Sequence, residues 1–548
     1  MIRKTISTIL FSLACLTAWA IPAKRVTRTL TLTDGTQVAA TFMGDELFHY
    51  WQAEDGTQYT EQADGTFAAL DARAREARAR KARQRAAQEN SRRRQRRRAG
   101  SAMTGNKRGI VILVNFTDKK MVCSRDEFDR AFNQTGYSDH GSAGSVRDYF
   151  LAQSYGQLTV DFDVVGPYTL KNNMKYYGGN DSDGNDLRPG TMVIEAVKAA
   201  DPYVNFADYD WDGDGEVDQV YVVYAGYGEA QSNIANNIWP HEWDLTSAYY
   251  YGDGAGAQRV DGVTVDTYAC SNELIYGKST QIDGIGTACH EFSHCLGLPD
   301  IYDTSGITSN YGMGSWDLMN TGSYNGDGYV PAAFTSYERW FAGWLTPTEI
   351  SDYTRVKDMK ALTDAPEAYV IYNQADRNEY YLLENRQRKG FDAELAGSGL
   401  LVLHVDYDSN VWYNNEVNNT RGHERMTIVP ADNNRSETRE SGDPWPQLNK
   451  TELTNTSTPA ATLYNANTDG KKLLNMPLRN ITLANGLISF TAGETPTGIH
   501  SATDGTGTNA SPALFDIQGR RVDKAQRGLY LLKGKKVMMT GYSPSSGK

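Results

Sequence analysis

The sequence predicts a multidomain protein in which a mixed α and β region is followed by an all-β region and a small β module at the C-terminus. At 548 residues the chain is too long for one compact core. Hydrophobic residues make up 40% of it and aromatic residues 11%, which is enough to build packed cores and argues against general disorder. Helical and strand patterns alternate between residues 107 and 348, whereas the runs after residue 350 are short and separated by turn residues.

The first residues have the pattern of an export signal, so we expect a signal peptide at residues 1–20. Arg3 and Lys4 precede an apolar run over 6–18, and small residues at 18 and 20 predict cleavage after Ala20. Cys15 would suggest lipoprotein processing instead, but it lies inside the apolar run. No later run reaches the 18 or so apolar residues of a spanning helix, so we expect an exported protein with no transmembrane segment.

A strongly basic segment follows. Between Ala72 and Arg98 there are thirteen Lys and Arg against two Glu, or +11, in a chain whose net charge is -12. The segment has no interleaved aromatic residues and the rest of the chain is acidic, which argues against nucleic-acid binding. We expect an exposed linker that a processing protease cuts, with the last good site between Arg98 and Ala99.

The region before this linker predicts a small β prodomain, so that residues 21–98 form a propeptide. Its short apolar runs are separated by Asp-Gly pairs, which favour tight hairpin turns; the pairs begin at Asp34, Asp55 and Asp64. The segment contains no Cys, which excludes a thiolate latch on a metal site. A carboxylate latch from Asp45, Glu46 or Asp55 remains open.

Residues 99–349 have the size and pattern of a catalytic domain of mixed α and β structure. A buried strand is predicted at 109–116, an alternating apolar and polar run lies at 158–165, a further strand is predicted at 217–224, and helices are predicted at 145–151 and 192–200.

The chemistry is concentrated in one helix. His290 and His294 are four residues apart, so they lie on one helix face and can bind a single Zn²⁺, while Glu291 projects toward a zinc-bound water. Gly297 can end this helix in a left-handed conformation, and Pro299 prevents it from resuming. The chain then turns back and brings Asp300 within reach of the metal.

Asp300 lies six residues beyond His294, the spacing at which zinc peptidases of the metzincin kind place a third ligand. We therefore predict a zincin or metzincin-like α+β catalytic domain in which three protein ligands leave one metal position open. Downstream, Met319 is preferred over Met313 as the hydrophobic floor of the site. Tyr324 is a candidate to hydrogen-bond the oxyanion.

With these motifs the sequence resembles the immune inhibitor A family of secreted bacterial metallopeptidases. The resemblance rests on the segments from His290 to Asp303 and from Trp316 to Met319. Shorter segments at 145–150, 154–156, 222–226 and 239–241 support it, and the segment at 380–386 continues it beyond the catalytic domain. It implies a zinc endopeptidase with Glu291 as the base. Asp303 competes with Asp300 for the role of third ligand.

The predicted reaction is peptide-bond hydrolysis. Zinc would lower the pKa of its bound water toward about 7, and Glu291 would take the water's proton and deliver it to the leaving amine. Substrates would be proteins or peptides, and the enzyme would be made as a zymogen. One alternative is a catalytically silent secreted adhesin or binding protein on the same fold, and another is a zinc hydrolase of other amides or esters. A binding protein would have no need of Glu291, which argues against the first alternative.

A second metal site is predicted at residues 210–218. Oxygen-bearing side chains at positions 1, 3, 5, 7 and 9, with a glycine at position 6, follow a Ca²⁺ loop, although position 12 is Tyr221 rather than Glu. These side chains are Asp210, Asp212, Asp214, Glu216 and Asp218. Calcium would tie down the loop, and the alternative is an acidic turn.

Other histidines and the cysteines are assigned no chemistry. His241 and His404 are interpreted as structural. The four cysteines that follow the signal peptide either form disulfides or remain as buried thiols; they are Cys123, Cys270, Cys289 and Cys295. Cys289 and Cys295 should not pair, because six residues on one helix place them far apart.

The remaining segments predict an all-β C-terminal half. Short runs at 369–372, 380–383 and 400–405 suggest a β-sandwich-like accessory domain over 350–494. A polar linker follows, and within 495–548 the run from Leu514 to Leu532 resembles the C-terminal sorting domains of type IX secretion. That resemblance implies a secreted or cell-surface protein of a Gram-negative bacterium.

Overall fold

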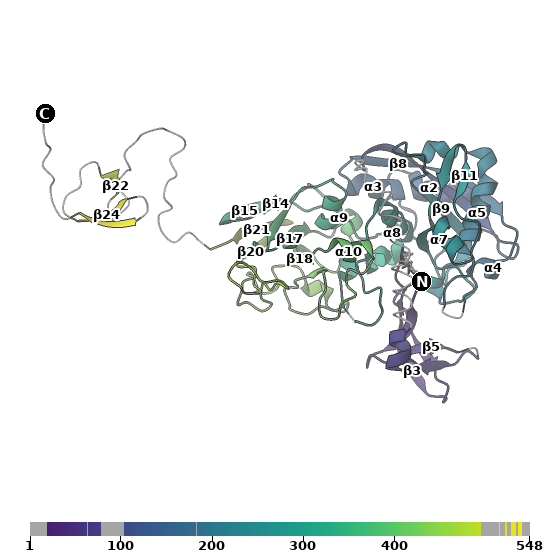
Figure 1. The fold of residues 1–548 in the computed structure, drawn as a ribbon, viewed down its shortest axis with the longest axis horizontal. Helices are drawn as coiled ribbons and strands as arrows, with labels where there is room; N and C mark the ends of the chain where they lie inside the picture. Colours follow the sequence, from purple (N-terminus) through teal and green to yellow (C-terminus); the bar gives the residue numbers. More distant parts are fainter. Residues whose placement is uncertain are drawn as a thin grey trace, which may run out of the picture.

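The computed structural model describes residues 19–62, 64–77, 103–181, 184–308 and 310–494, with strand segments at 514–515, 521–522, 528–532 and 535–539 (Figure 1). Most of the predicted signal peptide, most of the Arg-rich linker and most of the C-terminal region lie outside the described residues. In the described part, no helix is long and apolar enough to cross a membrane.

The N-terminal region folds into a five-stranded antiparallel meander, in agreement with the predicted hairpins. It forms the purple lobe at the bottom of Figure 1. Asp34 and Asp55 each accept a backbone N–H two residues on, and the following glycines have φ of 85° and 84°, which suits tight turns. The strands are β2 (Thr27–Thr31), β3 (Gln37–Gly44), β4 (His49–Ala53), β5 (Gln58–Glu61) and β6 (Phe67–Ala69).

The central region is built on a six-stranded sheet in the order β1-β10-β13-β9-β7-β8. The last four strands are parallel, while β10 runs antiparallel and pairs on its outer edge with β1. A separate hairpin is formed by β11 (Gln258–Val260) and β12 (Val263–Val265). The strands of the large sheet are β1 (Trp19–Ala20), β7 (Gly105–Asn115), β8 (Leu158–Thr169), β9 (Val220–Tyr227), β10 (His241–Asp244) and β13 (Thr267–Leu274).

Helices cover both faces of this sheet, because its parallel strands are apolar on both sides. Val111 and Leu113 of β7 share a core with α2, α3 and α8, whereas Ile110, Ile112 and Val114 share another with α4, α5 and α7. The helices are α2 (Arg125–Asn133), α3 (Val146–Gln153), α4 (Met174–Gly178), α5 (Pro189–Ala200), α6 (Glu229–Ser232), α7 (Leu245–Tyr250), α8 (Ile285–Leu296) and α9 (Ser336–Phe341).

Two further sheets follow and share one hydrophobic core. Their orders are β14-β16-β17-β18-β19 and β15-β21-β20. The elements are β14 (Thr348–Glu349), β15 (Thr354–Met359), β16 (Ala368–Tyr372), β17 (Glu379–Arg386), β18 (Gly399–Asp406), α10 (Ser409–Tyr413), β19 (Met426–Ile428), β20 (Leu478–Ala484) and β21 (Leu487–Ala492). A four-stranded sheet near the C-terminus contains β22 (Leu514–Phe515), β23 (Arg521–Val522), β24 (Gly528–Leu532) and β25 (Lys535–Met539).

Two central strands of the accessory sheet are buried on both faces. Every residue of β17 and β18 is buried, so these strands have no solvent-facing side. One face packs in the sandwich core, while Leu382, Leu403 and Val405 on the other face join the core that contains Phe292 of α8. The central and accessory regions therefore share one hydrophobic core, and this holds the accessory loops against the site described below.

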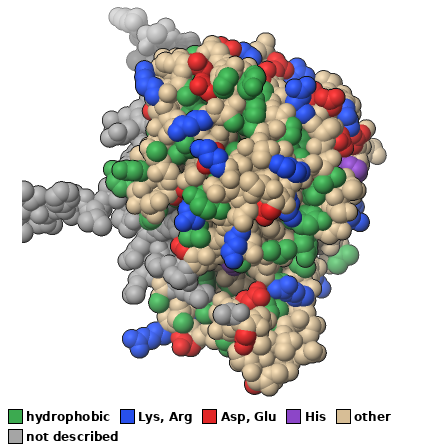
Figure 2. Space-filling view, turned by 90° about the vertical axis from the view of Figure 1, so that its right-hand side faces the viewer, with side chains coloured by type: hydrophobic (Ala, Val, Ile, Leu, Met, Phe, Trp, Pro, Cys, Tyr) green, Lys and Arg blue, Asp and Glu red, His purple; other side chains and the backbone are tan. Residues whose placement is uncertain are grey.

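The face of the molecule in Figure 2 carries basic and acidic side chains interspersed with apolar ones. The four cysteines that follow the predicted signal peptide lie in the described part of the chain, and each is a free thiol there. Cys123, Cys270 and Cys289 are buried, which agrees with the thiol alternative of the sequence analysis.

Candidate metal centre

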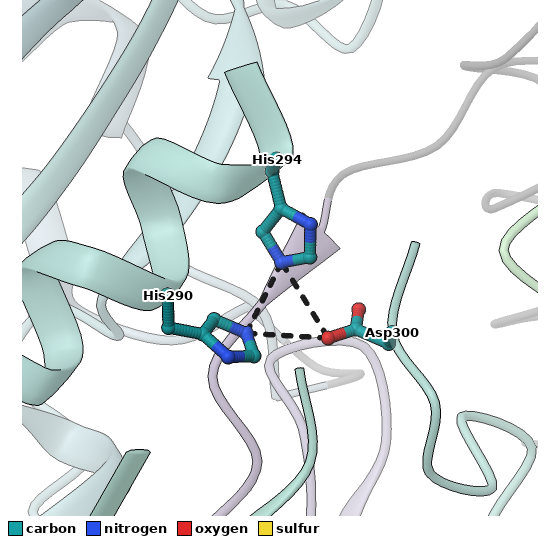
Figure 3. Close-up of side chains that lie close together, drawn as sticks. All are labelled: His290, His294 and Asp300. Atoms are coloured by element: carbon teal, nitrogen blue, oxygen red, sulfur yellow. Dashed lines mark hydrogen bonds and ion pairs between the residues drawn. The ribbon is translucent and has the colours of Figure 1, made fainter. Parts of the chain in front are cut away.

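Helix α8 presents the two histidines. It ends at Leu296 because Gly297 takes a φ of 106°, and the N–H of Leu298 donates to the carbonyl of Ser293 to close the last turn. His290 and His294 lie on one face of this helix, and Asp300, from the chain that follows the helix, points toward them (Figure 3). The helix stop therefore acts as the sequence predicts.

His290, His294 and Asp300 converge in the interior (Figure 3). The two Nε2 atoms lie 3.1 Å apart, and Oδ1 of Asp300 lies 3.2 Å from Nε2 of His290 and 3.4 Å from that of His294. All three residues are at most 1% exposed.

The protonation of these groups suits a cation. Nδ1 of His290 lies 2.8 Å from the carbonyl oxygen of Leu318, and Nδ1 of His294 lies 2.8 Å from that of Leu298. Because a carbonyl can only accept, each Nδ1 carries a proton, and in the neutral imidazole Nε2 then keeps its lone pair. Burial alone would raise the pKa of Asp300, but the two histidines lower it to about 2. Burial lowers the pKa of His294.

These donors fit a zinc ion. Oδ1 of Asp300 is buried, has no hydrogen-bond partner, and faces Nε2 of both histidines. Two histidine nitrogens and one carboxylate oxygen form a zinc ligand set that leaves one position open.

Asp303 is engaged elsewhere. Its carboxylate accepts backbone and hydroxyl hydrogens from Ser305 and Thr308 and so stabilises the loop that follows Asp300. It does not belong to the group of converging ligand atoms. The geometry favours Asp300 of the two alternatives.

Glu291 lies beside this group and is completely buried. Burial raises its pKa well above the usual range, and the charges of Asp300 and Glu242 raise it further. Its Oε1 accepts the backbone N–H of Ile21 at 2.8 Å, whereas its Oε2 has no hydrogen-bond partner. A carboxyl with a raised pKa next to a metal site suits proton transfer.

The N-terminal residues occupy the space in front of the site. Strand β1 extends the large sheet by pairing antiparallel with the edge strand β10, with Ala20 opposite His241. The carbonyl of Ile21 accepts the indole N–H of Trp239 at 3.0 Å, and that of Pro22 accepts the hydroxyl of Tyr324 at 2.7 Å. The predicted prodomain thus contacts Tyr324 and Glu291 at once.

The three prodomain carboxylates are placed differently. Asp55 is in an exposed turn, and Oδ1 of Asp45 accepts the N–H groups of Leu47 and Phe48. Glu46 has a buried Oε2 without a hydrogen-bond partner. Its pKa is raised well above the usual range by burial and by the charges of Asp45, Asp300 and Glu291. Of the three, Glu46 is therefore the one with a buried carboxylate oxygen that has no hydrogen-bond partner in the described part of the chain.

The structure does not distinguish Met319 from Met313 by burial, and it brings together only part of the predicted calcium ligands. Met319 is fully buried and follows Leu318, whose carbonyl holds His290, but Met313 is equally buried in the same core. In the calcium loop, Asp210, Asp212 and Asp214 converge. Asp218 instead accepts the N–H of Trp211, and its pKa is raised to about 7 by burial and by these three aspartates. The calcium site remains a prediction.

The other singled-out histidines have structural contacts. Nδ1 of His241 lies 2.7 Å from the carbonyl of Trp239 and its Nε2 lies 3.0 Å from the hydroxyl of Tyr268. His404 pairs with Glu379 at 2.8 Å in the accessory sheet.

Sequence reasoning missed Asn415. Its amide makes two hydrogen bonds with Asp300 across 115 residues of sequence. It belongs to an Asn-rich stretch after α10 that looks like an ordinary polar loop, so only its unusual density of asparagines could have drawn attention.

Residues 100–345 match the family model described as immune inhibitor A peptidase M6, catalytic domain. This match supports the peptidase M6 family. The pre-pro-metalloprotease PrtV of Vibrio cholerae is 31% identical over 237 residues, which cover 39% of this chain and 25% of PrtV. Immune inhibitor A of Bacillus thuringiensis is 24% identical over 250 residues, covering 40% of this chain and 35% of that protein.

A putative secreted metallopeptidase of Arthroderma benhamiae is 24% identical over 216 residues, or 36% of this chain and 31% of that protein. The chain thus spans between a quarter and about a third of these curated relatives. The matched region contains the three converging residues and Glu291, and the comparisons support a metallopeptidase. The accessory sheets and the C-terminal strands lie outside the match.

Proposed function

We propose that the chain is an exported zinc-dependent endopeptidase that is made as a latent precursor. The observation that carries the proposal is the convergence of two imidazole Nε2 atoms and one unshared carboxylate oxygen beside the buried Glu291. The peptidase M6 match over the same residues supports it. A binding protein without catalysis is not favoured, because it would gain nothing from burying the carboxylate of Glu291 beside Asp300.

His290, His294 and Asp300 would hold the zinc ion. When bound, zinc polarises the scissile carbonyl and lowers the pKa of water. Glu291 would take the proton of the attacking water and deliver it to the leaving amine, a transfer for which its raised pKa is suited. Tyr324 would donate its hydroxyl hydrogen to the carbonyl oxygen as negative charge develops there. Its hydrogen bond to the carbonyl of Pro22 supports this role.

Latency would come from residues 21–98. Their first residues, Ile21 and Pro22, contact Glu291 and Tyr324, two of the side chains proposed to act in catalysis. Ile21, Phe42 and Trp51 of this region pack with Trp239 in one apolar cluster, which would hold the segment in place. If signal cleavage follows Ala20, the nitrogen of Ile21 becomes an α-amino group facing the carboxylate of Glu291. Activation would need cleavage in the Arg-rich linker.

The test compares the full chain before and after limited trypsin treatment, with casein as substrate. We expect the treated chain to cleave casein, with about one zinc bound per chain. Glu291→Ala should keep the zinc and lose at least about 10²-fold in kcat, because general base catalysis contributes at least that much. Glu242→Gln, which removes another buried carboxylate of the same surroundings, should retain more activity.

The same assay separates the two aspartates. Asp300→Asn should lose zinc, whereas Asp303→Asn should keep it and lose only stability of the loop. A treated wild-type chain that holds zinc but cleaves no unfolded protein would favour a binding role. A chain that holds no zinc would contradict the metal assignment.

A further inference from the structure

A residue of the accessory region reaches into the metal centre. Asn415 lies two residues after α10 and is 5% exposed. Its Nδ2 donates to Oδ2 of Asp300 at 2.7 Å, and its Oδ1 accepts the backbone N–H of Asp300 at 2.7 Å. The orientation of the amide is fixed, because a backbone N–H can only donate and an ionised carboxylate can only accept.

The hydrogen bond from Asn415 gives the two carboxylate oxygens of Asp300 different surroundings. Oδ2 of Asp300 is taken by Asn415, whereas Oδ1 accepts no hydrogen bond and faces Nε2 of both histidines. The amide thereby fixes the rotation of the carboxylate group and leaves one oxygen directed at the metal position. Partners of this kind orient metal ligands and tune their affinity.

The loop that carries Asn415 is itself held in place. Asn415 has a φ of 52°, and its carbonyl accepts the hydroxyl of Thr304 at 2.9 Å. Asn418 is completely buried and donates to the carbonyls of Ile301 at 2.6 Å and of Met426 in β19 at 2.8 Å. The loop after α10 is therefore hydrogen-bonded both to strand β19 of the accessory sheet and to the loop that contains Asp300.

We propose that Asn415 is a positioning residue for Asp300, so that the metal centre includes the accessory region as well as the matched peptidase region. The proposal rests on the proposed zinc site. Asn415 touches neither metal nor substrate; it acts by holding the ligand. Residues 100–345 alone would contain every ligand but would lack the group that aims the third one.

Two variants of the full chain test this. Asn415→Gly removes both hydrogen bonds and tolerates the positive φ. Asn415→Asp keeps the shape of the side chain but replaces the donor that faces Oδ2 of Asp300 by an oxygen. The control is Asn419→Ala, which loses hydrogen bonds to Thr304 and Ser305 in the same loop but none to Asp300.

Zinc affinity is measured by competition with a chelator, before and after trypsin treatment, and the visible spectrum of the cobalt-substituted chain reports the coordination. We expect both Asn415 variants to bind zinc about 10- to 100-fold more weakly, to lower kcat more than they raise KM, and to alter the cobalt spectrum. The control should stay within about 3-fold in zinc affinity. If Asn415→Gly is insoluble, the same measurements are made on the isosteric variant Asn415→Asp alone.

Zinc affinities of the Asn415 variants within about 2-fold of wild type would overturn the proposal, and so would an equal loss in Asn419→Ala. Both results would leave the zinc site intact. Failure of the wild-type chain to bind zinc would instead refute the proposed function, so the two failures are distinguishable.

Discussion

Replacement of Arg386 should strongly destabilise the protein. The guanidinium is completely buried between the two regions of the molecule. It donates to Asp392 at 2.6 and 2.9 Å, to Glu384 at 3.1 Å, and to the carbonyls of Trp316 and Ala333 at 3.1 Å each. The Trp316 carbonyl lies three residues before Met319, so Arg386 connects the accessory sheet to the segment that carries Met319.

The expected loss follows from what Arg386→Met leaves behind. Asp392 and Glu384 each keep a backbone N–H donor, from Ala333 and Ser336, but lose the positive charge that compensates them. Removing one partner of a buried ion pair costs about 3–5 kcal/mol. The two carbonyls that lose a donor add to this, up to about 1–3 kcal/mol each where no water replaces it. We expect a loss of at least about 3 kcal/mol, or more than about 100-fold in the folding equilibrium.

Urea unfolding of the full chain, followed by tryptophan fluorescence, measures this loss. Arg377→Met is the matched control, because Arg377 pairs with Glu349 at an exposed site, where ion pairs contribute about 0–1 kcal/mol. Adding Glu384→Gln and Asp392→Asn to Arg386→Met should recover part of the stability, since the uncompensated charges are removed. An effect of Arg386→Met no larger than that of the control, or a triple variant no more stable than the single one, would refute the reasoning.

Three further predictions follow from the site. Tyr324→Phe should lower kcat on casein by about 10²-fold with little change in KM, because it removes one donor to the oxyanion; an unchanged kcat would exclude that role. A zinc chelator should abolish cleavage and added zinc should restore it, whereas restoration by calcium alone would contradict the zinc assignment. The pKa of Asp218 is raised to about 7 in the folded state, so between about pH 4 and 7 the folded chain binds more protons than the unfolded one. Without calcium, its stability should therefore decrease as the pH rises from about 4 to 7. Asp218→Asn or added calcium should reduce this fall in Tm against pH, and identical profiles would count against a calcium loop.

Short-range features of the site could be predicted from the sequence. The stop of α8 at Gly297 and the turns at the Asp-Gly pairs depend on residues a few positions apart, so local conformational preference decides them. The choice between Asp300 and Asp303 could not be made, because both follow Pro299 closely. It depends on Ser305 and Thr308, which supply hydrogens to the second carboxylate.

Long-range features could not be predicted. The N–H of Ile21 meets Glu291 across 270 residues, and a backbone group has no side-chain identity that a sequence could reveal. The strands β17 and β18 suggest an independent sandwich from their length and turns. Their burial on both faces appears only when the fold packs them against α8.

The order in which the chain is synthesised gives the contact between Ile21 and Glu291 a further consequence. A ribosome makes the five strands β2–β6 before it reaches α8, and it reaches Asn415 only after both. The segment proposed to block the site is thus made before the proposed metal ligands, and Asn415, which we propose orients Asp300, is made after all of them. On these proposals, a nascent chain passes through no stage in which the catalytic residues are complete and the blocking segment is absent.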